Sequence, residues 1–377
     1  MNKKEILEIR KQFTFDRCAI TRICGCYVNH EKEKKTEFKK AFLSLPEEEG
    51  YKYFDIFKHT LSGTLGKNML NMEFPLEQEM SGGSQEFLLK LRDSKLTDDI
   101  LLEEFYEKVI ANFAYDENYF IILIHAVYDV PGKSSDGLEM FDASDTVYEH
   151  ILCSICPVNL TKAGLTYNAE TNNIEDRIRD WLVDPPIYGF LFPAFNDRAT
   201  DIHNLLYYTK KPEALQPQFI SDFLGSRIPL TAGDQKNGFQ ALIEETLGEE
   251  CKYEVVKNIH ENLHEMMEEA KENPDPLELS KPEVKRLLSL SGVPDEQLET
   301  FDQGFESIMG EQKTVMAANI TNTKSFQINT PDVVIKVKPE RMDLIETREI
   351  DGRKCLVIEI TDNLEVNGVE VSKTTIE

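Results

Sequence analysis

Two apolar stretches decide the fold, YFIILIHAVYDV at residues 119–130 and TVYEHILCSICPVNL at residues 146–160. Both are rich in β-branched and aromatic residues, which pack well on a pleated surface. A polar loop that contains glycine separates them. Neither reaches the ~20 apolar residues that a membrane-spanning helix needs. The pattern predicts two β-strands that pair as a hairpin in a protein without a membrane partner.

The sequence around this hairpin mixes helical and strand patterns. Residues 3–13 carry apolar side chains at helical spacing, and AITRICGCYV from Ala19 has the composition of a strand. Pro46 suits the start of a helix, because apolar residues recur after it at spacings of one, three and four. Residues 1–215 are therefore predicted to form a mixed α/β domain with a small antiparallel sheet.

The middle of the chain, residues 216–312, is predicted to be helical. Ser280 precedes Glu283 by three residues, the spacing of a capping box, and Pro282 falls in the tolerated first turn. Gly292 can end this helix in a left-handed conformation, and Pro294 can begin the next. The pattern predicts an αα-hairpin.

The C-terminal part, residues 313–377, changes to short alternating runs such as VVIKVK and KCLVIEI. Asp351-Gly352 and Asn367-Gly368 stand where tight hairpin turns require positive φ. An antiparallel β meander is expected here. The fold class predicted from the whole sequence is α+β.

The charge balance restricts the partners of this 377-residue chain. Its 42 basic and 68 acidic residues give a net charge of −26, which opposes nonspecific attraction to nucleic acids and anionic membranes. The acidic stretch at residues 241–280 should face water or a basic protein. Nucleic acid would need a local basic face. The candidate basic residues are Lys34, Lys35, Lys39, Lys40, Lys210 and Lys211, and the pattern favours a solvated helix face over a binding patch.

The cysteine count and the first residues indicate a cytoplasmic protein. Seven cysteines are an odd number in a chain long enough to fold without disulfides, which favours a reducing compartment. The start, MNKKEILEIRKQF, has neither the continuous apolar stretch nor the small-residue cleavage site of a secretion signal.

Two cysteine pairs, Cys24 with Cys26 and Cys153 with Cys156, are the candidate metal ligands. Four thiols could close a tetrahedral zinc site if the two segments were adjacent. The alternative is that these cysteines are buried, since both pairs lie in apolar strand-like runs. In a regular strand, Cys153 and Cys156 would also point to opposite faces.

A second metal hypothesis comes from His260-Glu261-Asn262-Leu263-His264, which has the spacing of a zinc metalloprotease helix. Ile259 and Leu263 form the apolar stripe of this helix, which puts both histidines beside the buried seam. The sequence does not single out a third ligand. A chance match in an acidic helix is the alternative.

The segment from Pro193 gathers Asp197, Arg198, Asp201 and His203 around a predicted loop-to-helix transition. Such side chains can bind a phosphate or transfer a proton. The structural alternative is that Asp201 caps the helix, while Arg198 pairs with Asp197 or Asp201 at the surface.

Five phrases of the sequence resemble an uncharacterised domain-of-unknown-function family of Gram-positive anaerobes, and the resemblance covers nearly the whole chain. It implies no activity. The phrases are MNKKEILEIRKQF, ITRICGCYV, SGTLGKNMLNMEFPL, HILCSICPVNLTKAGLTYN and FLFPAFNDRATDIHNLLYY.

A more distant resemblance is to the bacterial nucleoid-associated protein family. From Tyr119 the order of paired strands, a helix ending in QFISDFLG at residues 218–225, long helices and a terminal β region is similar to that family. It implies no catalytic motif, so no functional residue is transferred.

The leading hypothesis is a non-enzymatic protein of the bacterial cytoplasm, either nucleoid-associated-like or a scaffold. It would act through a protein partner, or on nucleic acid through a local basic face. Two alternatives stay open: a zinc-dependent enzyme or module, and an acidic adaptor that binds a basic protein.

Overall fold

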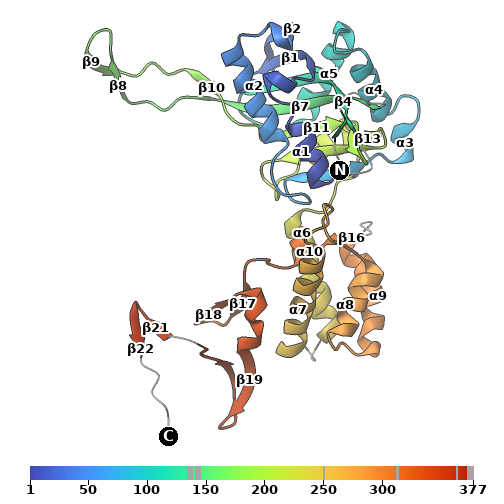
Figure 1. Ribbon diagram of the computed structural model, residues 1–377, viewed down its shortest axis with the longest axis vertical. Coiled ribbons are helices and arrows are strands. Elements are labelled where there is room, and N and C mark those ends of the chain that lie inside the picture. Colours follow the sequence, from blue (N-terminus) through green and yellow to red (C-terminus); the bar gives the residue numbers. More distant parts are fainter. Residues whose placement is uncertain (134–138, 141–145, 249–250, 311–313, 362–363, 372–377) are drawn as a thin grey trace. The chain divides into compact units, whose positions relative to one another are not determined.

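The computed structural model describes residues 1–133, 139–140, 146–248, 251–310, 314–361 and 364–371 (Figure 1). The chain divides into two compact units, unit 1 at Met1–Thr231 and unit 2 at Ala232–Glu377. Within the described ranges, no helix is both long and apolar enough to cross a membrane. The predicted α+β class is confirmed, and the predicted three-part division at residues 215 and 312 stays a prediction.

Unit 1 is built on one antiparallel sheet, larger than the small sheet expected. The predicted hairpin is confirmed, since Leu123 pairs with Cys153 in an antiparallel register that runs from Tyr119 to Val130. An eighth strand, β10 (Trp181–Val183), pairs with β7. The other strands, in spatial order, are β2 (Lys34–Ala41), β1 (Ile20–Val28), β4 (Tyr119–Val130), β7 (Thr146–Leu160), β11 (Tyr188–Phe192), β14 (Asn204–Thr209) and β3 (Met69–Glu73).

Helices cover both faces of this sheet. One face packs against α1 (Lys3–Arg10) and α2 (Glu47–Thr60), and the other against α4 (Ser84–Asp93), α5 (Asp99–Asn112) and the single π-turn η4 (Phe219–Phe223). Burial on both faces explains why the central strands are continuously apolar and do not alternate.

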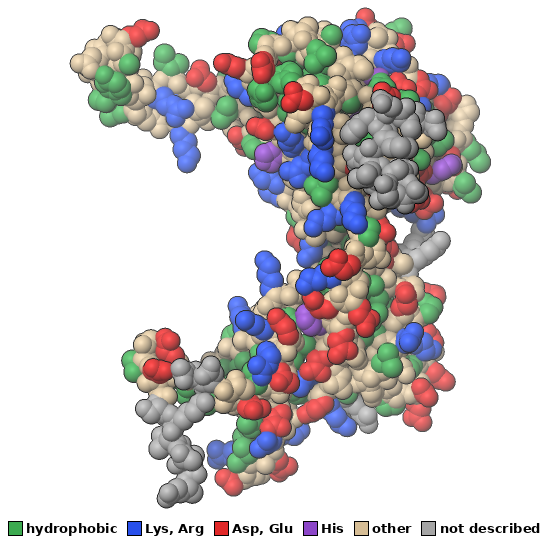
Figure 2. Space-filling view, in the orientation of Figure 1, with side chains coloured by type: hydrophobic (Ala, Val, Ile, Leu, Met, Phe, Trp, Pro, Cys, Tyr) green, Lys and Arg blue, Asp and Glu red, His purple; other side chains and the backbone are tan. Residues whose placement is uncertain are grey.

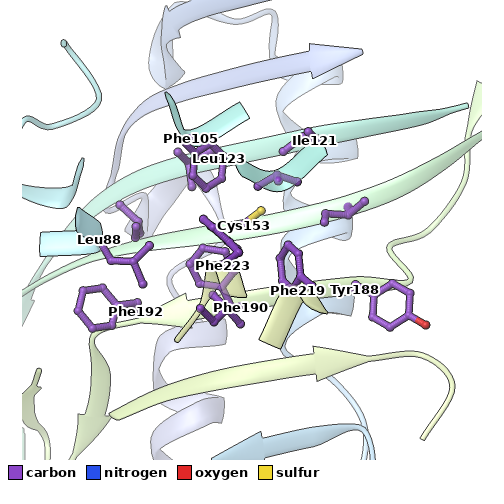
Figure 3. Close-up of a cluster of buried hydrophobic side chains, with 14 of the residues drawn as sticks. Leu88, Phe105, Ile121, Leu123, Cys153, Tyr188, Phe190, Phe192, Phe219 and Phe223 are labelled. Carbon is purple, nitrogen blue, oxygen red and sulfur yellow. The ribbon is translucent and has the colours of Figure 1, made fainter. Parts of the chain in front are cut away.

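The cluster on the α4–α5 face is the larger of the two buried groups (Figure 3). Phe105, Phe219 and Phe223 extend from the helical side onto Leu123 and Phe190 of the sheet. Each fully buried phenylalanine contributes about 1.5–3 kcal/mol through removal of apolar surface from water. This cluster therefore holds η4 and α5 to the sheet.

The N-terminal helix and several short elements complete unit 1 around the sheet. Asn2 and Glu5 form a capping box at the start of α1, so the N-terminal helix begins at a defined residue. The remaining short elements are η1 (Phe15–Arg17), η2 (Phe42–Ser44), α3 (Leu76–Glu79), β5 (Gly132–Lys133), β6 (Glu139–Met140), β8 (Leu165–Asn168), β9 (Asn173–Asp176), β12 (Ala194–Asn196) and β13 (Ala199–Asp201).

Unit 2 begins with a helical bundle. Its helices are α6 (Ala232–Leu247), α7 (Tyr253–Glu269), α8 (Lys281–Leu290), α9 (Asp295–Met309) and α10 (Ala317–Ile320), with β15 (Glu278–Ser280) paired to β16 (Thr314–Met316). The predicted αα-hairpin is confirmed. Ser280 and Glu283 form the capping box of α8, Gly292 has a φ of 94°, and Pro294 caps α9.

The C-terminal strands of unit 2 pair two by two in the described part of the chain, without a continuous meander. Asp351-Gly352 and Asn367-Gly368 occupy hairpin turns with positive φ, as predicted. The pairs are β17 (Phe326–Asn329) with β18 (Val334–Val337), β19 (Ile345–Ile350) with β20 (Arg353–Ile358), and β21 (Leu364–Val366) with β22 (Val369–Val371); η6 (Pro339–Leu344) precedes β19.

Candidate functional site

The predicted loop-to-helix transition after Pro193 is wrong, because the segment forms a β-hairpin. Strands β12 and β13 are joined by Asp197 and Arg198, whose φ values of 51° and 57° belong to a two-residue hairpin turn. The expected helix is strand β14, whose apolar residues are buried on both faces of the sheet. Asp201 therefore caps no helix.

Three of the four predicted binding residues, Arg198, Asp201 and His203, have side-chain partners, and the fourth, Asp197, lies in the turn beside Arg198. Arg198 Nη2 lies 2.8 Å from Glu8 Oε1 of α1, so it does not pair with Asp197 or Asp201 as expected. Asp201 accepts hydrogen bonds from Asn196 and Asn204 and from the backbone N–H of His203.

The contacts of Asp201 and His203 shift the pKa values of these two side chains. Burial opposes the charge of Asp201, but its three hydrogen bonds outweigh this and lower its pKa. The carboxylate of Glu79, 2.7 Å from His203 Nδ1, raises the pKa of that imidazole. These contacts connect the hairpin to α1 through Arg198, and the residue after Ile202 to α3 through His203. A role in phosphate binding or proton transfer stays a prediction.

The structure does not bring the four cysteines of the predicted zinc site together. Cys24, Cys26 and Cys153 lie on the α4–α5 face, and Cys156 lies on the opposite face, as strand alternation requires. Strand β4 separates β1 from β7, since Leu123 pairs with both Cys24 and Cys153.

Burial also opposes the thiolate form that a zinc site needs. It raises the pKa of Cys24 and of Cys26 to about 12, and it raises those of Cys153 and Cys156. Over the described ranges, no three His, Cys, Asp or Glu side chains are grouped to hold a metal ion. The two cysteine pairs act as small apolar core residues in this fold.

The two histidines of α7 do share one pocket. His260 and His264 line a cavity of about 270 Å³ within unit 2, together with residues of α6 and of the segment after α10. Glu261, which would be the general base of a metalloprotease, instead pairs with Lys257 at 3.4 Å and does not line the pocket. The predicted position of His260 and His264 on one side of the helix agrees with the structure. The residues that line their pocket differ from those of a hydrolytic zinc centre.

The predicted basic residues of β2 lie among carboxylates. Lys34 pairs with Glu37 and Glu103, Lys35 with Glu33, and Lys39 with Asp99. Strand β2 is an edge of the sheet, where lysine is a common protection against pairing with another chain. Lys40 lies over the Phe38 ring, and Lys210 and Lys211 are exposed. Strand β2 therefore presents an edge whose charge is largely compensated.

A projecting hairpin of unit 1, residues 161–180, was missed in the sequence; we call it the arm. It leaves β7 and returns to β10, and β8 and β9 lie well away from the sheet (Figure 1). Tyr167 pairs directly with Ile174, and Leu165 with Asp176, so three apolar side chains and one carboxylate share a face. The other face carries Thr166, Asn168, Asn173 and Glu175.

The apolar face of the arm is exposed. Leu165 is 76% exposed and Ile178 83%, and Tyr167 and Ile174 are also more than half exposed. Figure 2 shows hydrophobic side chains gathered at the end of the arm. The alternating pattern of LTYN and NIED was the available signal, but four residues are too few to distinguish a ribbon from a loop.

An apolar hollow of about 610 Å³ lies at the base of the arm, in unit 1. Trp181 and Leu182 of β10, both more than half exposed, form one wall, and Tyr53, Ile56 and Phe120 form the other. Glu49, Asp55 and Asp184 stand among its lining residues. We call this feature the arm-base hollow.

A second hollow of unit 1, of about 720 Å³, has a basic lining. It is formed by Leu7, Arg10, Lys11, Thr14, Asp16, Arg17 and Lys58. The four cations have no ion-pair partner among the residues that the structure describes, and Figure 2 shows basic side chains over α1 and α2. We call it the basic hollow. Its cations come from three elements, so no single run of sequence revealed it.

The sequence matches the family described as Domain of unknown function (DUF4317) over residues 1–369. The chain belongs to the DUF4317 family. The match covers all of unit 1 and nearly all of unit 2, including the arm and both hollows. No match to a curated protein or to a solved structure was found. The resemblance to an uncharacterised family is thus confirmed, while a source in Gram-positive anaerobes and kinship with nucleoid-associated proteins stay predictions.

One further arrangement in the DUF4317 chain joins a hydroxyl, an imidazole and a carboxylate. Thr21 Oγ1 lies 2.6 Å from His125 Nδ1, and His125 Nε2 lies 2.8 Å from Glu149 Oε1. This is the order of nucleophile, base and orienting group in covalent catalysis. Residues 21, 125 and 149 are far apart in sequence, so no spacing motif indicated it.

The surroundings of this triplet in the DUF4317 chain are those of a structural link. His125 is fully buried, and burial lowers its pKa against the opposing effect of Glu149. Thr21 Oγ1 is also 3.2 Å from the backbone oxygen of His125, which holds the hydroxyl against β4 at a bulge of β1. The triplet ties β1, β4 and β7 together at one end of the sheet.

Proposed function

We propose that this DUF4317 protein is a non-enzymatic scaffold that self-associates through its arm. The observation that carries the proposal is the exposed apolar face of the arm, with a polar face opposite. A two-stranded ribbon alone is marginally stable in water, and exposed apolar patches mark interaction sites. A partner that covers Leu165, Tyr167 and Ile174 supplies the missing layer.

The occupant of this face is a second copy of the same chain. The arm-base hollow offers an apolar surface of matching chemistry, walled by Tyr53, Ile56 and Trp181. The charged side chains that line the hollow are of both signs, Glu49, Asp55 and Asp184 with Lys52, so the match between arm and hollow is an apolar one. In a two-fold dimer, each arm covers the hollow of the other copy. The contact between arm and hollow therefore forms twice.

The oligomeric state of the full chain in solution tests this function. Light scattering after size-exclusion chromatography should give a dimer at micromolar concentration. The double variant Tyr167→Ser with Ile174→Ser should give a monomer, because it removes the apolar face. The matched control, Thr166→Ala with Glu175→Gln on the polar face, should stay dimeric. A monomeric wild-type chain, or a dimer that the apolar-face variant leaves intact, would overturn the proposal.

A second candidate function is binding of nucleic acid, carried by the basic hollow. Arg10, Lys11, Arg17 and Lys58 line one surface in a chain of net charge −26, which is the local basic face that a nucleoid-associated-like role requires. The resemblance to nucleoid-associated proteins supports this candidate. We place either function in the cytoplasm, supported by seven free cysteines.

Fluorescence anisotropy of a labelled duplex tests the second candidate. Saturable binding that weakens steeply with salt is expected, since phosphate contacts release counterions. Lys11→Gln with Arg17→Gln should weaken it, whereas Lys35→Gln on strand β2 should not. Absence of binding at low salt excludes the duplex and leaves the scaffold as the function.

A further inference from the structure

The pocket of unit 2 that holds His260 and His264 is assembled from four parts of the chain. Lys236 and Gln240 stand one helical turn apart on α6, and the two histidines stand one turn apart on α7. The segment from Thr321 to Asn329 and the residues Pro339 and Met342 of η6 close the other sides. The volume of this partly open pocket, about 270 Å³, suits a small molecule and is below the range of drug-sized sites.

The lining of this pocket has the opposite charge from the rest of unit 2. Residues 232–377 contain 31 acidic and 16 basic side chains. Among the described residues that line the pocket, however, there is no Asp or Glu. The lining consists of Lys236, Gln240, His260, His264, Ile320, Thr321, Asn322, Thr323, Ser325, Phe326, Gln327, Asn329, Pro339 and Met342. A cavity of cations, hydroxyls and amides within an acidic unit is suited to an anion.

The hydrogen-bond donors of the pocket are available for such an anion. Lys236 has no ion-pair partner in the described ranges, and its ammonium can supply a full positive charge. Burial lowers the pKa of His260, which favours the neutral ring. Thr321 Oγ1 is 3.0 Å from His260 Nδ1 and can donate to it, which leaves the ring proton on Nε2 as a donor.

The turn after Thr321 adds short polar side chains. Asn322 accepts a hydrogen bond from the backbone N–H of Lys324 and donates to Ser325 Oγ at 3.2 Å, so the turn holds its own shape. Thr323 and Ser325 of this turn line the pocket. Hydroxyl and amide donors around one lysine are the usual surroundings of a bound phosphate.

One wall of the pocket is apolar. The ring of Phe326 lies 5.7 Å from the ring of His260, and Ile320 and Met342 line the same cavity. An inorganic ion would leave this wall uncovered. A phosphate ester with a small organic body would use both the polar and the apolar sides.

We propose that this pocket of unit 2 binds a small organic phosphate, with Lys236 carrying the charge and His260, His264, Thr323 and Ser325 supplying donors. A metal ion fits the site less well, because the two imidazoles have no third His, Cys, Asp or Glu ligand grouped with them in the described residues. The proposal is independent of the scaffold function, which rests on unit 1.

The test is titration of the full chain with phenyl phosphate and with inorganic phosphate, at constant ionic strength set by chloride. Binding is followed by calorimetry and by the imidazole C–H resonances of the seven histidines, with His260 and His264 assigned through His260→Gln and His264→Gln. We expect saturable binding that shifts the resonances of these two histidines, with phenyl phosphate tighter than inorganic phosphate.

Variants separate this site from nonspecific ion effects. Lys236→Gln should weaken phenyl phosphate binding roughly tenfold, the effect of one lost charge-assisted hydrogen bond. Lys271→Gln is the matched control, since Lys271 is exposed, pairs with Glu268 and does not line the pocket. Thermal midpoints of both variants should equal that of the wild type, because both lysines are exposed.

Three results would overturn the proposal. They are no saturable binding of either phosphate, binding that Lys236→Gln leaves unchanged, and resonance shifts of His260 and His264 that only Zn²⁺ produces. The last result would restore the metal hypothesis for α7.

Discussion

The central sheet and the arm are continuous in the chain, yet they differ in what covers them. Strand β7 is buried at Tyr148 and from His150 to Val158, with helices on both faces of the sheet. The arm that follows it has an equally apolar face at Leu165, Tyr167 and Ile174, and that face is exposed. The buried apolar side chains of the sheet stabilise the fold of unit 1, whereas the exposed apolar side chains of the arm do not contribute to its core. The difference is the observation on which the proposed self-association through the arm rests.

The largest expected effect on stability comes from replacing a buried aromatic residue of the sheet by alanine, compared with the same replacement on the arm. Phe190 of β11 is fully buried, so Phe190→Ala should lower the free energy of unfolding of unit 1 by about 3–5 kcal/mol. Tyr167→Ala on the arm should change the stability of the monomer by no more than about 0.5 kcal/mol. Urea unfolding can be followed by the fluorescence of Trp181, the single tryptophan, which lies in unit 1. Equal losses would refute the distinction between the two regions.

Replacing a glycine by alanine in each region should show the same contrast in stability, with a smaller effect. A Cβ at Gly189 of β11 would lie 2.4 Å from the backbone oxygen of Cys153 and 2.6 Å from a Thr60 methyl group. Gly189→Ala should therefore destabilise unit 1 by about 1–3 kcal/mol, because a backbone contact cannot relax cheaply. Gly164, at the start of the arm, has no atom within 4 Å of such a Cβ. Gly164→Ala should be neutral in the same unfolding experiment, and a large loss there would show that the arm packs more tightly than its exposure indicates.

The elements that sequence reasoning predicted correctly depend on local signals. The β4–β7 hairpin follows from two long apolar runs, and the α8–α9 hairpin from the Ser280 capping box and Gly292. The NLLYYT run of β14 was taken for a helix because a strand buried on both faces loses its alternation, and a short continuous apolar run suits either structure. Tertiary pairing with β11 and β3 decides it.

The candidate sites could be predicted only in part, for a related reason. The helical spacing of His260 and His264 correctly placed both on one side of α7, but the anionic preference of their pocket depends on Lys236 and on the Thr321–Ser325 turn, which are distant in sequence. The zinc hypothesis for the cysteines depended on two segments being adjacent. Strand alternation places Cys156 on the other face, as the alternative reading of that strand expected.

Lowering the pH should reduce the free energy of unfolding through the central sheet and not through the arm. This is the smallest of the expected effects. His150 of β7 is buried, and burial, with a smaller contribution from His125, lowers its pKa from 6.5 to about 3. Below pH 6.5 the unfolded chain therefore binds a proton that the folded chain does not, so stability is full above this pH and is lost as the pH falls. Between pH 7 and 5.5 the loss from His150 should be about 1 kcal/mol. The buried His125 has a lowered pKa as well and acts in the same direction.

Urea unfolding at the two pH values should show this loss in the wild type and a smaller loss in His150→Leu, while Tyr167→Ala should keep the pH dependence of the wild type. A variant without His150 that loses as much stability as the wild type would assign the acid sensitivity to groups outside the buried sheet.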